Sequence, residues 1–228
     1  MFTDKINKKI LDIWRNYCNN DDLSPVLYND IKPSNILFLS LNPSFPKFSK
    51  GMRKDLGFES DSDLTDFYKW GNYDTTKSHI FKLEDKIAKE SYPYFNKIKE
   101  IANELGYIDS WLHLDLFFYR ETNQNEFLNK VYSNNYLNNF GERQFNLIYH
   151  NIHKIDPKVI VVPNAMASKI LKNRFSIDRN EVREKGYNTV KINNKDIPIF
   201  FSGMFSGQRA MDIDSFNRPI YLIKKSIN

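Results

Sequence analysis

Four short segments of this sequence end or follow an apolar run and carry side chains that can hold a water molecule or a ligand. They are LNPSF (41–45), DLFFYRET (115–122), VPNA (162–165) and SGMFSGQRAMD (202–212). In an open parallel sheet, ligands bind beyond the carboxyl ends of the strands. We therefore expect the polar residues of these segments to converge in one crevice.

Asn42 is the most informative of these residues, because it stands directly between an apolar run and Pro43. A side chain in that position has little room to move. Its amide both donates and accepts hydrogen bonds, so it can hold a water molecule or a substrate. The alternative is an Asx turn that only closes the strand.

Other catalytic arrangements fit the sequence less well. Ser206 lies in GMFSGQ, which lacks the G-x-S-x-G spacing of a hydrolase nucleophile, and no histidine follows it. His150 and His153 have no matching carboxylate pattern nearby, so we interpret them as surface residues rather than metal ligands. Asp212 and Asp214 are spaced like the paired carboxylates of a metal-dependent nuclease, although Asp214 is better placed to begin the last helix. The G-x-x-x-x-G-K phosphate loop is absent from the sequence.

The elements that must position these residues are strands that are apolar throughout. The four runs are ILFLSL (36–41), WLHLDLFF (111–118), VIVV (159–162) and IPIFF (197–201). Each is too short for a typical helix and too continuous for a strand with one wet face, so each suits a parallel strand covered on both faces.

Helical patterns separate these runs. Apolar residues recur at helical spacing over 6–14, 95–105 and 147–155, and Asn164 can cap a further helix over 165–171. Residues 189–192 and the turn after them predict a strand that leads into the last apolar run. The fold class is therefore α/β, a three-layer α/β/α sandwich around a four-stranded, mainly parallel sheet.

Length and composition predict one domain. With 228 residues, 41% of them hydrophobic, the chain is long enough for a single well-buried domain over 1–228. The stretch at about 45–91 reads as an insertion or lid, within which DLTDFYKW predicts a small helix. The single cysteine, Cys18, excludes an internal disulfide and any site built from several thiolates.

Charge and hydropathy indicate the partner and the compartment. The sequence shows neither a bilayer-spanning apolar run nor a secretory pattern, so we expect a cytoplasmic protein with no membrane partner. A net charge of +5 and a pI of about 9.0 favour a polyanion, because lysines and arginines that bind phosphates release counterions. We expect a monomer that uses neither cofactor nor metal.

Four stretches, taken in order, resemble the motifs of the uracil-DNA glycosylase superfamily, in particular its mismatch-specific branch, of which this chain would be a divergent member. They are ILFLSLNPSF, HLDLFFYRET, KVIVVPNAMASKIL and FFSGMFSGQRAMD. The resemblance covers roughly residues 33–212, and the order of its short motifs is more specific than any one of them. It implies a four-stranded parallel sheet, a base flipped out of DNA, and hydrolysis of the N-glycosidic bond.

The resemblance also implies roles for single residues. LNPS is similar to the first motif, whose asparagine positions the attacking water, so Asn42 would hold that water; Ser40 and Ser44 stand where glycines are usual. FSGMFSGQRA is similar to the second motif, a loop that enters the minor groove, with Phe205 as the wedge in the vacated stack. We expect substrate contacts from Ser40, Pro43, Ser44, Phe45, Asn164, Ser202 and Met204, and DNA contacts from Phe205, Ser206, Gln208, Arg209 and Arg120.

The chain departs from the family in its second motif. The family's histidine there, which stabilises the departing base anion, is replaced by Phe201 or Ser202, so that stabilisation must come from elsewhere. No lysine is placed as a nucleophile in these motifs. The resemblance therefore predicts a monofunctional enzyme that leaves an abasic site through an oxocarbenium-like transition state.

Asp115 aligns with the residue that reads the pyrimidine edge in the uracil enzymes, so we expect it in the catalytic site with Asn42. A carboxylate only accepts hydrogen bonds and suits the exocyclic amine of a cytosine-type base, whereas a protonated Asp115 would donate to a uracil-like carbonyl. A long 45–91 insertion would give room for a bulky base, as in modified phage DNA. The alternative for Asp115 is a structural role, capping a turn or pairing with Arg120.

Three functions therefore stay open. The first is a glycosylase for uracil or a modified cytosine in double- or single-stranded DNA, acting in repair or in defence against phage. The second is a protein of the same fold that binds nucleic acid without cleaving it, consistent with the missing histidine. The third is a metal-dependent nuclease that uses Asp212 and Asp214.

Overall fold

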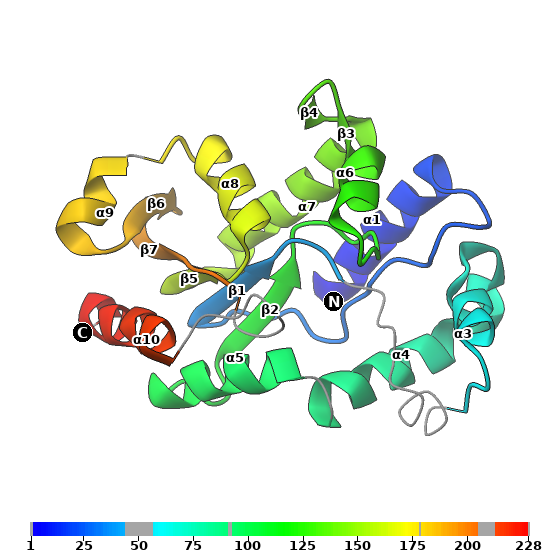
Figure 1. The fold of residues 1–228 in the computed structure, drawn as a ribbon, viewed down its shortest axis with the longest axis horizontal. Coiled ribbons are helices and arrows are strands. Elements are labelled where there is room, and N and C mark those ends of the chain that lie inside the picture. Colours follow the sequence, from blue (N-terminus) through cyan, green and yellow to red (C-terminus); the bar gives the residue numbers. More distant parts are fainter. Residues whose placement is uncertain (1, 44–56, 91–92, 178, 205–212, 228) are drawn as a thin grey trace. The chain divides into compact units, whose positions relative to one another are not determined.

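The structure is a computed structural model that describes residues 2–43, 57–90, 93–177, 179–204 and 213–227 (Figure 1). The chain divides into two compact units, each assembled from three segments of the sequence. Unit 1 comprises Met1–Asp30, Asn42–Ser91 and Phe117–Leu147, and unit 2 comprises Ile31–Leu41, Tyr92–Leu116 and Ile148–Asn228. Because these segments alternate along the chain, no single cut in the sequence separates the units.

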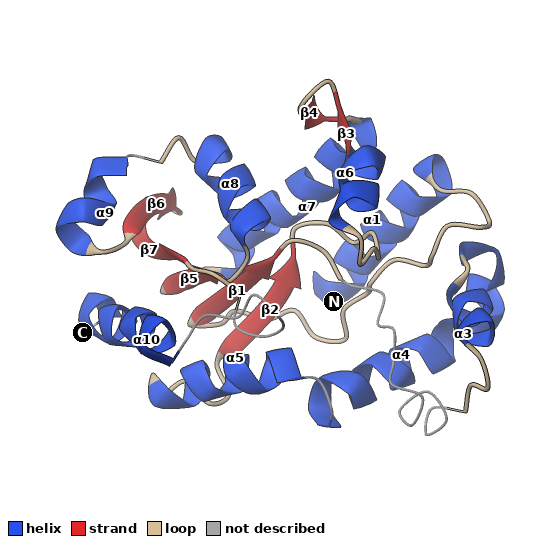
Figure 2. Ribbon diagram, in the orientation of Figure 1, coloured by secondary structure: helices blue, strands red, loops and turns tan. Residues whose placement is uncertain are grey.

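Unit 2 contains a five-stranded sheet in the order β2-β1-β5-β7-β6 (Figure 2). Its strands are β1 (Ile36–Ser40), β2 (Trp111–Asp115), β5 (Val159–Val162), β6 (Asn188–Ile192) and β7 (Lys195–Phe201). Strands β1, β2, β5 and β7 run parallel to one another, which confirms the predicted α/β class and the predicted parallel strands. The predicted count of four was wrong, because β6 adds an antiparallel fifth strand. Asn193 and Asn194 both take positive φ, so they form the tight turn of a β6–β7 hairpin.

Helices flank this sheet on both faces. They are α5 (Pro93–Glu104), α7 (Asn139–Ile155), α8 (Ala165–Arg174), α9 (Arg179–Lys185) and α10 (Ile213–Ile227). Buried residues of α5 and α10 pack on one face against alternate residues of the strands, such as Phe38, Val161 and Phe200. The intervening strand residues point to the opposite face, where α8 contacts β5 (Figure 1). Both faces are covered, which explains why the strands read as continuous apolar runs.

The helix ends follow the signals in the sequence. The helix α5 stops just before Gly106, which has φ +75°, and the Tyr107 amide donates to the Ala102 carbonyl (2.8 Å). The helix α7 stops before Pro157, and Asp156 takes φ +50° there. The predicted helices over 95–105 and 147–155 are therefore confirmed.

Unit 1 is mainly helical and has an aromatic core. Its elements are α1 (Phe2–Tyr17), α3 (Asp61–Tyr68), the 3₁₀ helix η1 (Trp70–Asn72), α4 (Tyr73–Glu90), α6 (Gln124–Val131), the short hairpin β3 (Tyr132–Ser133) and β4 (Tyr136–Leu137), and the first part of α7. Trp14 packs edge-on against Phe140 at 5.3 Å between ring centroids, and Phe117 packs against Phe127 at 5.2 Å. The high aromatic content of the chain is used largely in such contacts.

The sequence predicted one strand over the apolar run at 111–118, and this prediction was wrong. The β2 strand ends at Asp115, and the last ladder bond runs from the Leu116 amide to the Ser40 carbonyl (2.9 Å). Phe117 and Phe118 are fully buried in unit 1 instead. The run is continuous because its two ends fill the cores of two different units.

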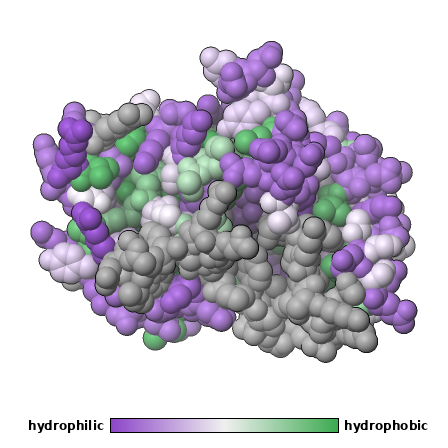
Figure 3. Space-filling model, viewed as in Figure 1, coloured by the Kyte–Doolittle hydropathy of each residue, from purple (hydrophilic) through white to green (hydrophobic). Residues whose placement is uncertain are grey.

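The predicted insertion contains regular structure where it is described. DLTDFY forms α3, and Ser60 caps it: the Ser60 hydroxyl accepts from the Asp63 amide while the Asp63 carboxylate accepts from the Ser60 amide. The described side chains on the face seen in Figure 3 are mainly hydrophilic. Among the described residues, no helix is both long enough and apolar enough to cross a membrane.

Candidate functional site

The side chain of Asn42 is held in one orientation within unit 1. Its Nδ2 donates to the main-chain carbonyls of Pro43 (3.2 Å), Tyr119 (3.2 Å) and Glu121 (2.8 Å). Three acceptors around one end of the amide identify that end as the nitrogen, because an oxygen there would face three other oxygens. The amide oxygen Oδ1 is left as an acceptor, and it makes no hydrogen bond to any residue that the structure describes.

The described contacts of Asn42 differ from those of the Asx turn that was the alternative for this residue, and the Ser44 amide that such a turn would use lies outside the described residues. An Asx turn uses the side-chain oxygen to accept from a nearby backbone amide. Here the side-chain nitrogen makes the contacts, and two of its three acceptors lie 77 and 79 residues further along the chain. Among the described residues, therefore, none donates a hydrogen bond to this oxygen.

Arg120, which we expected to contact DNA, is buried in unit 1 with 5% of its surface exposed. Its Nε donates to the Ser24 carbonyl (2.9 Å), and its Nη2 donates to the Pro25 carbonyl (3.4 Å) and forms an ion pair with Glu84. The guanidinium also lies over the ring of Tyr68, 5.1 Å from its centroid. Because this side chain is buried and its Nε and Nη2 bond within the protein, we leave Arg120 out of the proposed DNA contacts. Its ionic partner is Glu84, not Asp115.

At the carboxyl edge of the sheet in unit 2, Ser40 and Asp115 are register partners on β1 and β2. His113, two residues before Asp115, places its Nε2 2.9 Å from the Ser40 hydroxyl and 4.0 Å from an Asp115 carboxylate oxygen. Side chains alternate along a strand, so all three share the face on which Phe38 packs with α5 and α10. Phe95 of α5 packs edge-on against the His113 ring at 5.3 Å.

His113 is the residue that sequence reasoning missed. Its side chain is 12% exposed, and burial lowers its pKa to about 4, so the imidazole is neutral at pH 7. Its period-two spacing from Asp115 in WLHLD placed both side chains on one face of β2. Only the parallel register with β1 brings Ser40 to them, and that register is not encoded in any local motif.

Asn164 follows β5 and caps α8, as its sequence predicted. Its Oδ1 accepts from the Ala167 amide (2.9 Å), and its main-chain carbonyl accepts from the Ser168 amide (2.9 Å). The side-chain oxygen of Asn164 therefore caps the helix α8.

Replacing Asn164 with alanine is expected to lower the free energy of unfolding by about 1 kcal/mol, because one helix donor loses its cap. Denaturant unfolding of the variant measures this loss. Asn164→Ser supplies another capping oxygen and should recover most of it. A change in ligand affinity without a change in stability would instead place Asn164 in substrate binding.

Ser202 and Met204 follow β7 at the same edge of the sheet. The Ser202 amide donates to the Val162 carbonyl (3.1 Å), which continues the β5–β7 ladder beyond the strand, and Met204 is 39% exposed. The other predicted contacts lie outside the described residues, namely Ser44, Phe45, Phe205, Ser206, Gln208 and Arg209.

A metal site finds no support in the part of the chain that is described. Within it, no group of three or more His, Cys, Asp or Glu residues is arranged to hold an ion. His153 contacts Asn193, with 3.4 Å between Nδ1 and Oδ1. Asp214 lies in the first turn of α10, as predicted, while Asp212 falls outside the described residues.

The predicted site residues thus form two sets. Asn42 and Pro43 belong to unit 1, where they contact the Tyr119–Glu121 backbone. The set at the carboxyl edge of the sheet belongs to unit 2 and comprises Ser40, Asp115, Asn164 and Ser202. A scan against models of known protein families gave no match to the chain, and a search of curated proteins gave none either.

Proposed function

We propose that this protein is a monofunctional DNA glycosylase that hydrolyses the bond between deoxyribose and a modified or mismatched pyrimidine, either uracil or a modified cytosine. The observation that carries the proposal is the orientation of Asn42. Its amide nitrogen donates toward three main-chain carbonyls, and its amide oxygen, which accepts from none of the described residues, would accept a proton of a water molecule. Orienting one water is the task that a hydrolytic glycosylase requires of such a side chain.

In the proposed reaction the bond from C1′ to the ring nitrogen breaks, and its electron pair leaves with the base. The water oriented by Asn42 adds through its oxygen to C1′, which carries oxocarbenium character in the transition state. An amide is a weak base, so Asn42 orients the water and does not deprotonate it. The water loses a proton once the new C–O bond forms, and that proton ends on the departed base. The products are an abasic site and a free base.

The Ser40, His113 and Asp115 cluster is the candidate reader of the base. Its members lie side by side at the carboxyl edge of β1 and β2, where ligands of parallel sheets bind. A neutral His113 has one donor and one acceptor nitrogen, of which Nε2 already shares a hydrogen bond with the Ser40 hydroxyl. An ionised Asp115 accepts from an exocyclic amine, and a protonated one donates to a carbonyl, so the same cluster suits a cytosine-type base or uracil, depending on that proton.

The remaining support is electrostatic and comes from the motifs. A net charge of +5 favours a polyanion, and the wedge and phosphate-binding roles of Phe205 and Arg209 rest on the family resemblance alone. A wedge compensates for the hole that an extruded base leaves in the stack, which costs a few kcal/mol. The resemblance to the uracil-DNA glycosylases supports the proposed reaction, and the carboxyl-edge cluster supports the proposed binding of a base.

A panel of oligonucleotides tests the proposal. Single- and double-stranded DNA carrying uracil, a thymine mismatch, hydroxymethylcytosine or glucosylated hydroxymethylcytosine is incubated with the protein, and the products are treated with alkali. We expect strand cleavage of one substrate class only after alkali. Direct nicking that requires a divalent metal would establish a nuclease instead, and binding without cleavage of any substrate would establish a nucleic-acid-binding protein.

A further inference from the structure

The loop over residues 118–121, here called the 118–121 loop, is held by hydrogen bonds to the main chain of Phe118, Tyr119 and Glu121. The amides of Phe118 and Tyr119 both donate to the Oε1 of Gln144, at 2.7 and 3.2 Å, and Gln144 is fully buried. The Glu121 amide donates to the Pro43 carbonyl (3.2 Å). The carbonyls of Tyr119 and Glu121 are the acceptors for the Asn42 side chain. The direction of the Asn42 amide is therefore set by this loop.

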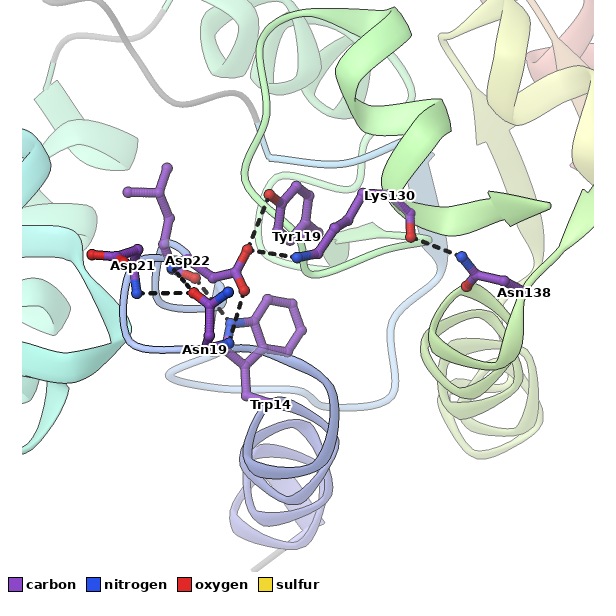
Figure 4. A network of polar contacts seen from close by, with 8 residues as sticks. Trp14, Asn19, Asp21, Asp22, Tyr119, Lys130 and Asn138 are labelled. Atoms are coloured by element: carbon purple, nitrogen blue, oxygen red, sulfur yellow. Dashed lines mark hydrogen bonds and ion pairs between the residues drawn. The ribbon is translucent and has the colours of Figure 1, made fainter.

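One flank of the loop is anchored through the side chain of Tyr119. Figure 4 shows Tyr119 and Lys130 pointing toward the carboxylate of Asp22. The Lys130 Nζ lies 2.6 Å and the Tyr119 hydroxyl 3.4 Å from the same carboxylate oxygen. Asp22 in turn accepts from the Asn19 amide (2.9 Å), so this anchor continues into the segment after α1.

Arg120 anchors the loop from its centre. Arg120 lies in the sequence between Tyr119 and Glu121, whose carbonyls accept from Asn42. Its buried side chain binds the Ser24 and Pro25 carbonyls and pairs with Glu84 of α4. Only 6% of the Arg120 side chain and 19% of the Glu84 side chain are exposed. A buried ion pair with further hydrogen bonds is a poor source of net stability, but its directional contacts fix one arrangement of the groups around it.

We propose that Arg120 and Glu84 are positioning residues for Asn42. Their ion pair holds the Tyr119 and Glu121 carbonyls in the places that turn Asn42 Oδ1 toward the water, and neither residue touches the substrate. This inference rests on the proposed function for its catalytic consequence. The geometric consequence, an ordered Asn42 amide, can be measured without any substrate.

The test compares three variants of the full chain. Arg120→Met keeps the length and apolar character of the stem but removes every donor. Glu84→Gln keeps an acceptor for Arg120 and serves as the conservative variant. Asp66→Asn removes the partner of Lys69 in an exposed ion pair of the same unit and is the matched control. The readouts are kcat and KM on the substrate that the panel identifies, and the exchange rate of the Asn42 Nδ2 protons with solvent, followed by NMR.

We expect Arg120→Met to lower kcat by about 10- to 100-fold with KM nearly unchanged, because misplacing the water weakens only the transition state. The Asn42 Nδ2 protons should exchange at least about tenfold faster, since their acceptors are no longer held. Glu84→Gln should show a smaller change in both readouts, and Asp66→Asn none.

A folded Arg120→Met protein with wild-type Asn42 exchange and wild-type kcat overturns the inference. If that variant does not fold, Arg120→Lys replaces it, because lysine keeps the charge but cannot reach all three acceptors at once. Faster Asn42 exchange in Arg120→Lys then supports the inference, and wild-type exchange overturns it. If the wild-type protein cleaves nothing on the panel, the proposed function fails, whereas the exchange measurement still decides whether the ion pair orders Asn42.

Discussion

Replacement of Asn42 by alanine is expected to lower kcat by at least about 100-fold and to leave DNA affinity within about twofold of the wild-type value. The variant removes the amide oxygen that is proposed to orient the water, and it leaves the net charge of +5 unchanged. It also removes three hydrogen bonds to main-chain carbonyls. Steady-state cleavage of the panel substrate measures kcat, and fluorescence anisotropy measures the affinity.

Two further variants separate orientation from stability. In Asn42→Asp an oxygen replaces the nitrogen that now faces three carbonyl oxygens, so we expect lower stability as well as lower activity. Asn7→Ala is the matched control, because the amide of Asn7 also bonds to main chain in unit 1, at the Tyr28 amide and carbonyl. Asn7→Ala should lose stability but keep its turnover. Full activity in Asn42→Ala would remove this residue from the mechanism.

Acidification is expected to destabilise the protein through His113. In the unfolded chain this histidine takes up a proton near pH 6.5, whereas burial lowers its pKa in the folded state to about 4. Protons therefore bind the unfolded state preferentially between these values. The stability from this group is complete above about pH 6.5 and is lost as the pH falls to about 4, by about 3 kcal/mol in total.

Urea unfolding at pH 7 and at pH 4.5 checks this expectation, with His113→Gln as the test variant. Glutamine keeps a hydrogen-bonding group near Ser40 but does not titrate, so the variant should lose about 2 to 3 kcal/mol less stability over this pH range. His150→Gln, at an exposed position, serves as the control and should behave as the wild type. An NMR titration of the His113 ring gives its folded-state pKa directly, and a value near 6.5 would contradict the prediction.

The fold was predictable because its strands are buried on both faces. Strands of this kind consist of continuous runs of Ile, Val, Leu and Phe, which can be recognised in the sequence. The strand at 159–162 has the predicted bounds in the structure. The prediction of strand ends was wrong where one apolar run contributes residues to two different cores. The run at 111–118 continues from the sheet into the core of unit 1, and no local feature marks the change.

The candidate site was predictable to the extent that it depends on positions next to strand ends. Asn42 and Asp115 could be identified because each lies in or next to an apolar run of the sequence. Ser40 lies beside Asp115 in the sheet. Arg120 was misinterpreted because a basic residue in a polar segment reads as exposed, and its carboxylate partner, Glu84, lies 36 residues away. His113 was missed because its contact to Ser40 crosses 73 residues of sequence. Pairings of this kind depend on tertiary structure, which local periodicity does not encode.

The interleaving of the two units has a consequence for how the protein is made. Unit 1 needs residues from 1–30 and from 117–147, and unit 2 needs residues from 31–41 and from the last stretch of the chain. During synthesis, therefore, the first strand of the sheet leaves the ribosome long before β2 and β5, its parallel neighbours, exist. Contacts between residues so distant in sequence slow folding, and the apolar strands stay exposed to solvent until their partner strands have been synthesised. Expressing either half of the sequence alone should therefore yield an insoluble product.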